Sequence, residues 1–251
     1  MIRVVLIGSG NLAYHLHKAL LKAEGVALLA MSSRRAESLV DFEAVVPRLP
    51  LGAPHKEADL YILAVSDQAI ASVVELYQGE DALFVHTSGA MGISALGSVQ
   101  RKGVLYPLQT FSRDREISFE TIPICVEVAL YPDTALLTDL ARALSKEVYE
   151  LSEEERRSLH LAAVYVNNFS NHMLYLGEML CKRAGLPEKL LHPLIGETFA
   201  KVKDLSAYEA QTGPARRKDL QTQKAHLQLL EKAFEKELYT MISESIRRTY
   251  E

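Results

Sequence analysis

Apolar residues fall into short runs in the first part of the chain, and stretches with helical spacing lie between them. Residues 4–7 form the first run, whose β-branched residues suit a buried strand. The run breaks at Gly8, and residues 11–21 then carry apolar side chains at helical spacing. This alternation predicts a parallel sheet flanked by helices. The same reasoning gives strands at residues 26–31, 59–65 and 82–85 and a helix at residues 69–77.

The alternation ends at residue 152, where the chain changes character. Ser152 and the glutamates after it begin a helix that runs to about residue 183 and stops at Gly185. Further strands are expected at 105–111, 122–128 and 147–151, and further helices at 134–145, 187–203 and 220–248. We therefore expect an α/β fold: an N-terminal Rossmann-type doubly wound sheet (residues 1–152), then an all-helical C-terminal domain (residues 153–251). Two-domain dehydrogenases share this layout, with the substrate in the cleft between domains.

Gly8, Gly10 and Ala13 follow the first strand with the spacing G-x-G-x-x-A, which is typical of dinucleotide-binding turns. The first glycine permits a tight turn, the second lets a pyrophosphate approach the backbone, and the small third residue lets the helix pack on the strand. The helix N-terminus then offers N–H groups to the phosphates. The alternative is a tight turn without a ligand. The expected cofactor-binding residues here and at the next strand ends are Gly8, Ser9, Gly10, Asn11, Leu12, Ala13, Val65, Ser66 and Thr87.

The second predicted strand ends in two serines and two arginines, namely Ser32, Ser33, Arg34 and Arg35. In NAD-binding sites an acidic residue about 20 positions beyond the glycines binds the ribose 2′-hydroxyl. Hydroxyl and guanidinium groups suit a 2′-phosphate instead, because a guanidinium donates several hydrogen bonds to phosphate. These residues therefore predict NADP as the cofactor, and the alternative is a solvated helix start.

Polar residues interrupt the apolar positions of the long predicted helix, and they are His160, Asn167, Asn168, Asn171 and His172. At about 100° per residue, Asn167 and Asn171 fall within roughly 20° of His160, and Asn168 lies to one side. Polar groups on such a helix must find hydrogen-bond partners or ligands. The stripe therefore either bonds to a neighbouring helix or faces a substrate. His86, at another strand end, lies either near the cofactor or in a structural position.

The composition of the 251 residues is 48% hydrophobic and 24% charged, as is typical of a soluble globular protein. The net charge is −4 without a basic block, so nucleic acid is not an expected partner. Cys125 and Cys181 lie far apart and predict neither a disulfide framework nor a metal site. No signal peptide or membrane span is visible, so we expect no membrane partner and a cytoplasmic location.

Five motifs, spread over nearly the whole chain, are together more specific than the glycine fingerprint. They are Gly8-Ser9-Gly10-Asn11-Leu12-Ala13, His86-Thr87-Ser88-Gly89-Ala90, Pro107-Leu108-Gln109-Thr110-Phe111, His160-Leu161-Ala162-Ala163 with Asn168, and Thr212-Gly213-Pro214-Ala215-Arg216-Arg217-Lys218-Asp219 with His226. On these residues the chain resembles the family of Rossmann-like proteins with a C-terminal DUF2520 domain. That family is similar to pyrroline-5-carboxylate reductases and other NADP-dependent reductases. The resemblance implies an NADP oxidoreductase and leaves the substrate open.

The chain departs from that family at two places. Many members have His-Pro where Tyr106-Pro107 stands here, and Arg-Gly-Asp where Arg217-Lys218-Asp219 stands. Because lysine adopts glycine's positive φ only at a cost, the second change calls a close backbone approach at residue 218 into question. Hydroxyacid dehydrogenases of similar layout use a lysine one turn before an asparagine. Val164 and Ala163 occupy the corresponding positions here, which argues against that mechanism.

The sequence as a whole predicts an NADP-dependent reductase of a small imine or carbonyl. The cofactor supplies hydride, and the protein supplies orientation and a proton. His86, His160 and Tyr106 are the candidate proton donors, with His160 favoured by its place on the helix. We expect Asn168 to orient the substrate and Arg217 to hold a substrate carboxylate or to pair with Asp219. The alternative is a non-catalytic NADP-binding sensor or scaffold.

The last helical segment carries more apolar side chains than one small domain can bury. We therefore expect a homodimer formed mainly by the C-terminal helices. The residues that suggest this interface are Leu227, Leu229, Leu230, Phe234, Leu238 and Met241.

Overall fold

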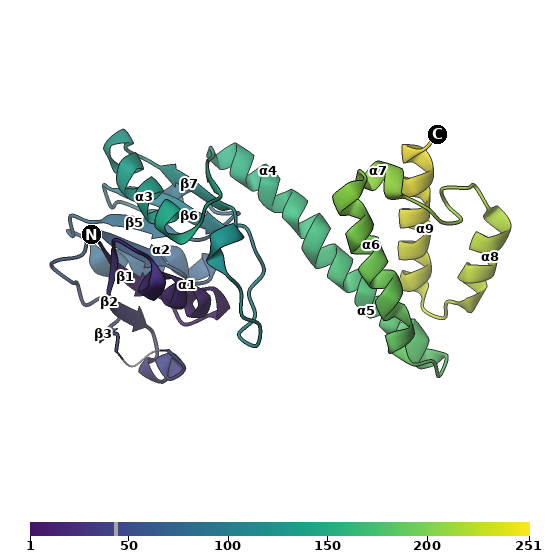
Figure 1. Cartoon of the computed structure of the whole chain (residues 1–251), viewed down its shortest axis with the longest axis horizontal. Coiled ribbons are helices and arrows are strands. Elements are labelled where there is room, and N and C mark those ends of the chain that lie inside the picture. Colours follow the sequence, from purple (N-terminus) through teal and green to yellow (C-terminus); the bar gives the residue numbers. More distant parts are fainter. Residues whose placement is uncertain (43–44) are drawn as a thin grey trace. The chain divides into compact units, whose positions relative to one another are not determined.

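The computed structural model of the chain describes residues 1–42 and 45–251. These residues form two compact units, Met1–His172 and Met173–Glu251. The first unit holds the sheet and the beginning of the long helix, and the second holds the remaining helices (Figure 1). The boundary expected after residue 152 falls where the last strand ends, whereas the compact units divide further along the helix.

The first unit is built on one sheet, whose described strands lie in the order β3-β2-β1-β4-β5-β6-β7-β8. Neighbouring strands run parallel, except that β6 and β7 are antiparallel. The chain thus builds outward from β1 in both directions, as in doubly wound folds. The strands are β1 (Ile2–Ile7), β2 (Val26–Ser33), β3 (Arg48–Pro50), β4 (Leu60–Leu63), β5 (Leu83–His86), β6 (Lys102–Pro107), β7 (Ile124–Val128) and β8 (Val148–Glu150).

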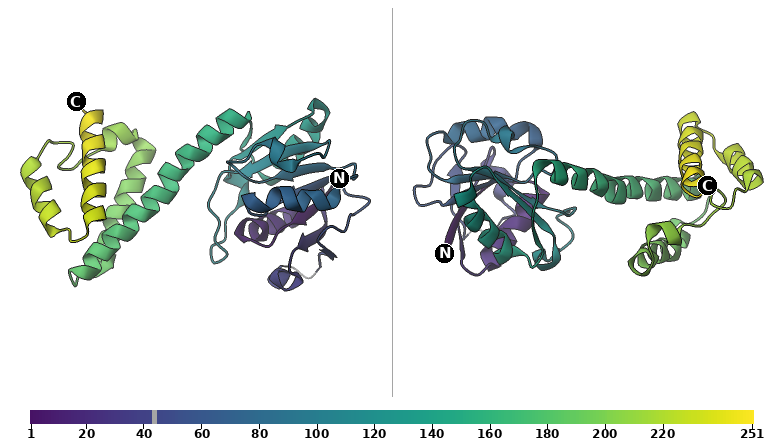
Figure 2. Two further views of the ribbon diagram at one scale, coloured as in Figure 1. Left: turned by 180° about the vertical axis from the view of Figure 1, so that it is seen from behind. Right: turned by 90° about the horizontal axis from the view of Figure 1, so that it is seen from above.

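Helices cover both faces of this sheet (Figure 2). Successive residues of a strand point to opposite faces. Val4 and Leu6 of β1 therefore pack with α1 (Asn11–Lys22) and α3 (Thr134–Leu144) on one face. Val5 and Ile7 pack with α2 (Ile70–Val74) on the other. Burial on both faces explains the continuous apolar runs and confirms the α/β class expected from the sequence.

Two strands differ from the sequence prediction. β3 was not predicted, because it is three residues long and ends at Pro50 without an apolar run. β6 begins at Lys102 and ends at Pro107, earlier than the predicted segment at 105–111. Its first residues, Lys102 and Gly103, carry no apolar signal, although Gly103 is buried against the β7 backbone.

The long helix begins with a capping box. The Ser152 hydroxyl accepts a hydrogen bond from the backbone N–H of Glu155, and the Glu155 carboxylate accepts one from the backbone N–H of Ser152. The helix continues as α4 (Glu153–Ala163), a π-helical segment (Val164–Phe169) and α5 (Ser170–Arg183). Gly185, at φ +69°, follows its end, in agreement with the predicted stop.

The second unit continues with α6 (His192–Asp204), α7 (Ala207–Ala210), α8 (Leu220–Leu229) and α9 (Ala233–Thr249). The single helix predicted over residues 220–248 is wrong, because the chain turns extended at Leu230. Leu230 is buried there, so packing overrides a sequence that contains no helix breaker. Among the described helices, none has the length and apolar character needed to cross a membrane.

Candidate functional site

The glycine-rich loop lies tightly against the end of β4. Gly8 has a φ of +136°, and a Cβ placed on it would come within 2.1 Å of the Ala64 carbonyl oxygen. Its N–H donates to the Ser32 carbonyl oxygen at 2.8 Å. Gly10, in contrast, has open space at its Cβ position, and Ala13 is fully buried on the face of α1 that packs in the core with the β1 side chains. The three residues therefore play the parts expected of the fingerprint: tight turn, open approach and close helix packing.

A cavity of about 560 Å³ opens at the carboxyl ends of β1, β2, β4 and β5. The expected cofactor-binding residues that line it are Gly8, Ser9, Gly10, Asn11, Leu12, Ser33, Arg34, Val65, Ser66 and Thr87. Ser32 is fully buried, and its carbonyl is used by Gly8. Parallel strand ends beside a helix N-terminus are where open α/β sheets bind nucleotides.

The two arginines after β2 are placed differently. Arg34 lines this cavity, and among the described residues it makes no ion pair. Arg35 does not line it, and its carbonyl oxygen accepts hydrogen bonds from the Ser33 and Ser38 hydroxyls, both at 2.6 Å. Arg34 is therefore the better placed of the two to meet a ligand.

A second cavity, of about 600 Å³, adjoins the first. Asn11 and Leu12, at the start of α1, line both cavities. The other walls come from the segment after β6 and from α4 with the π-helical segment. They include Tyr106, Leu108, Gln109, Thr110, Phe111, Leu159, His160, Asn167 and Asn168. All of these residues belong to the first unit.

The segment after β6 is fastened to the glycine-rich loop by side chains of both. The Asn11 amide donates to the Phe111 carbonyl oxygen at 3.0 Å, and His15 Nε2 lies 2.9 Å from the Ser112 carbonyl oxygen. Arg113 donates to the Ser9 carbonyl oxygen at 2.7 Å and pairs with Asp41. Arg113 was not among the residues predicted from the sequence. These contacts thus fix the segment after β6, which lines the second cavity, to the glycine-rich loop, which lines the first.

Tyr106 and His160 form the polar pair of the second cavity. The Tyr106 hydroxyl lies 3.1 Å from His160 Nδ1, and the rings meet edge to face at 5.9 Å. Tyr106 is 9% exposed, and burial raises the pKa of its phenol. The phenol therefore keeps its proton at neutral pH and can donate it. Tyr106 stands where many family members have histidine, so either residue type supplies a proton-bearing group there.

The π-helical segment changes which asparagines face His160. In a regular α-helix Asn168 would lie about 80° from His160, and Asn171 about 20°. A π turn contains one extra residue, so the rotation per residue is smaller in this segment and Asn168 turns back toward the His160 side of the helix. Asn167 and Asn168 line the second cavity, whereas Asn171 and His172 are not among its described lining residues. The prediction from α-helical spacing did not include this shift.

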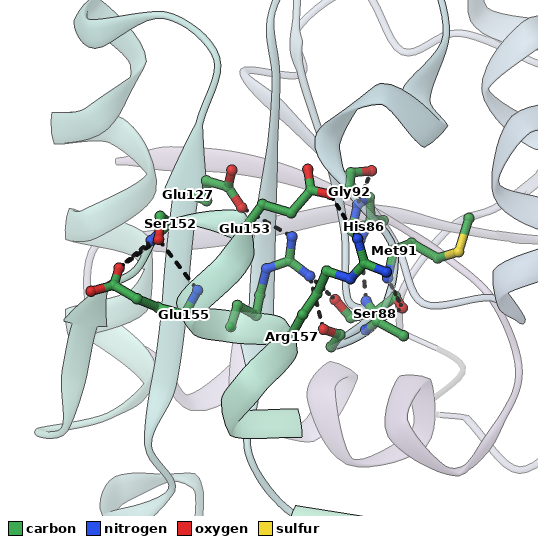
Figure 3. Close-up of polar contacts among 12 residues, drawn as sticks. His86, Ser88, Met91, Gly92, Glu127, Ser152, Glu153, Glu155 and Arg157 are labelled. Carbon is green, nitrogen blue, oxygen red and sulfur yellow. Dashed lines mark hydrogen bonds and ion pairs between the residues drawn. The ribbon is translucent and has the colours of Figure 1, made fainter. Parts of the chain in front are cut away.

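The side chain of His86 is hydrogen-bonded to the backbone of the loop that follows β5 (Figure 3). It is fully buried, its Nε2 donates to the Gly92 carbonyl oxygen at 3.1 Å, and its Nδ1 accepts from the Ser88 N–H at 3.2 Å. Burial lowers the pKa of His86 to about 4. The imidazole is neutral with both nitrogen atoms engaged, and it does not line the second cavity. This geometry favours the structural alternative over proton donation.

Arg217 lies in the second unit and is exposed on the loop before α8. The expected ion pair with Asp219 is absent from the described residues. Instead the Asp219 carboxylate caps α8 by accepting from the Thr222 N–H at 3.0 Å and the Thr222 hydroxyl at 2.7 Å. These bonds lower the pKa of Asp219. Lys218 does adopt the left-handed conformation, with φ +57°.

The fold and the fingerprint loop define a Rossmann-like domain. A Rossmann-like domain matches residues 1–111, and a domain of unknown function, DUF2520, matches residues 122–246. The chain is 39% identical to a Bacteroides fragilis protein described as a candidate NADP oxidoreductase, over 98% of both chains, with a TM-score of 0.89. The chain therefore belongs to the family of Rossmann-like proteins with a C-terminal DUF2520 domain, as its motifs indicated.

More distant solved structures share the fold. An imine reductase from Streptomyces aurantiacus is 14% identical, with a TM-score of 0.66, over 98% of this chain and 93% of that one. A 1-pyrroline-5-carboxylate reductase from Streptococcus pyogenes is also 14% identical, with a TM-score of 0.62, over 99% and 98%. No curated protein matches the sequence.

Proposed function

We propose that this protein is an NADP-dependent oxidoreductase that reduces a small imine or carbonyl compound. The observation that carries the proposal is the meeting of two cavities at Asn11 and Leu12. One has the loop and strand ends of a dinucleotide site, and the other holds the Tyr106–His160 pair and Asn168. The Bacteroides fragilis relative, described as a candidate NADP oxidoreductase, supports the same class.

The residues of the first cavity fit a dinucleotide phosphate. Gly10 leaves room at the helix N-terminus for the pyrophosphate, and Val65, Ser66 and Thr87 line the same cavity after the ends of β4 and β5. Arg34 and Ser33 line the same cavity, and their guanidinium and hydroxyl donors suit a 2′-phosphate, which is the reason for proposing NADP over NAD. Arg35 is proposed to contribute more weakly to binding of the 2′-phosphate, from outside the cavity.

The second cavity supplies orientation and a proton. Bound NADPH supplies a hydride to the carbon of a C=N or C=O bond. The nitrogen or oxygen then needs a proton, and His160, hydrogen-bonded to Tyr106, is the proposed donor. Tyr106 can pass its own proton to His160 Nδ1 and recover one from water. The Asn168 amide is proposed to hold the substrate, since it offers both donors and an acceptor.

Two further parts of the proposal concern the helical unit. We propose that Arg217 binds an anionic group of the substrate, because its guanidinium has no ion-pair partner among the described residues and is exposed. We also propose a homodimer formed through the C-terminal helices, which expose many large apolar side chains.

A screen of small imines and carbonyls, followed by NADPH absorbance at 340 nm, tests the proposed reaction. Once a substrate is found, we expect His160→Ala and Asn168→Ala to bind NADPH as the wild type does and to lose most turnover. Arg157→Lys, on the exposed side of α4, is the matched control and should keep full turnover. If the protein binds NADPH tightly but oxidises it with no compound in the screen, the sensor or scaffold alternative replaces the enzyme.

A further inference from the structure

One charged side chain that the proposed chemistry does not use is buried beside the second cavity. Arg156 on α4 is 1% exposed. Its Nη1 donates to the carbonyl oxygens of Ser88, at 3.1 Å, and Gly89, at 3.0 Å, and its Nη2 donates to the Glu127 carboxylate at 3.0 Å. Figure 3 labels Ser88 and Glu127 among the residues of these polar contacts. Arginine is almost never fully buried without such partners, so the position calls for an explanation.

The loop that Arg156 holds also touches the Tyr106–His160 pair. A Cβ added to Gly89 would lie 2.6 Å from His160 Nδ1 and 2.6 Å from Tyr106 Cζ. The Gly89 backbone therefore rests directly against both rings. His160 follows Arg156 by one helical turn, so two successive turns on the same face of α4 contact the loop.

The first turn of α4 approaches the same loop at its other end. A Cβ on Gly92 would meet the Glu153 carboxylate at 2.3 Å, so this glycine also permits close contact with the helix. Inside the loop, the Ser88 hydroxyl accepts from the N–H groups of Ala90 and Met91 (Figure 3). The loop after β5 is thus fixed internally by its own side chains and externally by α4.

We propose that Arg156 is a positioning residue: by holding the carbonyls of Ser88 and Gly89, it presses the loop after β5 against Tyr106 and His160 and sets the hydrogen bond between them. That the loop matters for proton transfer rests on the proposed function. That the loop packs against Tyr106 and His160 does not. Thr87, the residue before Ser88, lines the first cavity, which is the one proposed to bind the cofactor. Arg156 therefore fixes, through one loop, both a wall of the cofactor cavity and the proposed proton donor.

The charge of Arg156 also acts on the buried groups around it. Burial raises the pKa of Tyr106 and of Cys125, and the positive charge of Arg156 opposes both effects. For His86, burial and the charge of Arg156 both lower the pKa. The guanidinium therefore helps to keep His86 neutral while moderating the cost of a phenolate at Tyr106.

The imidazole nitrogen resonances of His160 test the proposal without any substrate. In the full-length wild-type protein labelled with ¹⁵N-histidine, we expect two well-separated resonances, because the Tyr106 bond fixes one tautomer. His160→Ala provides the assignment. In Arg156→Lys, which keeps the charge but not the paired donors, the two resonances should move toward each other, as in an imidazole that exchanges between its two neutral tautomers. The NADPH dissociation constant should rise by no more than about threefold.

Arg157→Lys is the matched control, because Arg157 is the next residue of the same helix and makes an exposed ion pair with Glu153. It should leave the His160 resonances unchanged. Gly89→Ala should give the same change in the His160 resonances as Arg156→Lys, because the added Cβ would push the Tyr106 and His160 rings apart. A folded Arg156→Lys protein with wild-type His160 resonances would overturn the proposal.

If Arg156→Lys does not fold, Glu127→Ala decides the matter. This variant keeps the guanidinium but removes the carboxylate that anchors Nη2, so the same change in the His160 resonances is expected to a smaller degree. Unchanged resonances in folded Glu127→Ala would contradict the positioning role. Failure to find any NADPH-consuming reaction would count against the proposed function but would leave these spectra and their meaning intact.

Discussion

The two compact units of this chain are built in opposite ways. In the first, the central strands β1, β4 and β5 bury nearly every side chain, and apolar clusters cover both faces of the sheet. In the second, the described residues that are buried are Ala215, Leu230 and Glu235. Its large exposed apolar side chains include Tyr175, Leu186, Leu190, Leu194, Phe199, Leu205, Tyr208, Leu220, Leu229, Phe234 and Met241. The first unit folds around its own apolar core, whereas the second unit exposes many large apolar side chains on its surface.

The interior of the second unit shows the same deficit. A cavity of about 420 Å³ lies between α5, α8 and α9, lined mostly by apolar side chains such as Leu176, Leu180 and Leu238. The Arg183–Glu235 ion pair, with both carboxylate oxygens 2.9 Å from Nη2, stands in its wall. Protein interiors are normally packed without voids larger than a few water molecules. A loosely packed helical unit that also exposes large apolar side chains supports the proposed homodimer.

The largest expected effect is the dependence of the helical unit on its partner. Light scattering at micromolar concentration should give the mass of a dimer. On dilution, the thermal unfolding of the helical unit should shift to lower temperature while the sheet unit keeps its transition, because only the former gains stability by association. A monomer mass at micromolar concentration would rule out the homodimer and remove this explanation of the exposed face.

Matched phenylalanine truncations sharpen the contrast. Phe84 on β5 is fully buried and stacks on Tyr61 at 4.8 Å, so Phe84→Ala should lower the free energy of unfolding by about 3–5 kcal/mol. Phe234 on α9 is 51% exposed, so Phe234→Ala should cost under about 1 kcal/mol in a dilute, monomeric sample. Urea unfolding measures both. Equal losses at low concentration would show that the helical unit has a core of its own.

Acid should weaken the sheet unit through His86. Above pH 6.5 the imidazole is neutral in the folded and unfolded states and has no effect on stability. Because burial lowers its pKa to about 4 when folded, only the unfolded state takes up a proton as the pH falls from 6.5 to 4. The free energy of unfolding should therefore drop by roughly 3 kcal/mol over that window. His86→Gln should lose less between pH 7 and pH 4.5, and an equal loss would contradict the assignment.

Cofactor preference is the next effect in size and concerns the sheet unit alone. Arg34 lines the cavity proposed to bind the cofactor and Arg35 does not, so Arg34→Ala should weaken NADPH binding by about tenfold, or 1.4 kcal/mol, and Arg35→Ala by less. NADH lacks the 2′-phosphate, so its affinity should change little in either variant. Calorimetric titrations give all the constants. Equal losses for NADPH and NADH in the double variant would argue against a phosphate contact.

The strands β1, β4 and β5 were predictable because each carries a continuous apolar run, and Gly8, Ser66 and Thr87 mark the turns that follow. β3 and the antiparallel pairing of β7 were not, since a three-residue strand has no periodicity and direction is set by the connection rather than the side chains. The break at Leu230 was hidden for a different reason. The residues from Leu229 to Ala233 are all compatible with a helix, and only tertiary packing extends the chain there.

The candidate site was predictable where it depends on local geometry. Gly8 and Gly10 follow from the turn, and His160 from its place among apolar neighbours. The role of Asn168 depends on the π-helical segment, which shifts the helical phase and leaves no mark in the residue types. Arg156 could have been found, because it lies one turn before His160 on the same face. Its partners, the carbonyls of Ser88 and Gly89, are backbone groups and carry no sequence signal.

The smallest expected effect lies in the loop of the helical unit. Lys218 has φ +57°, where a Cβ crowds the following carbonyl at a cost of about 1–2 kcal/mol. Glycine avoids that crowding but loses roughly 0.5–1 kcal/mol more backbone entropy on folding. Lys218→Gly should therefore raise the free energy of unfolding by about 0.5–1 kcal/mol. Lys218→Ala removes the same charged chain but keeps the Cβ, so it should bring no gain. A gain of equal size in both variants would trace the effect to the lysine side chain and not to the backbone.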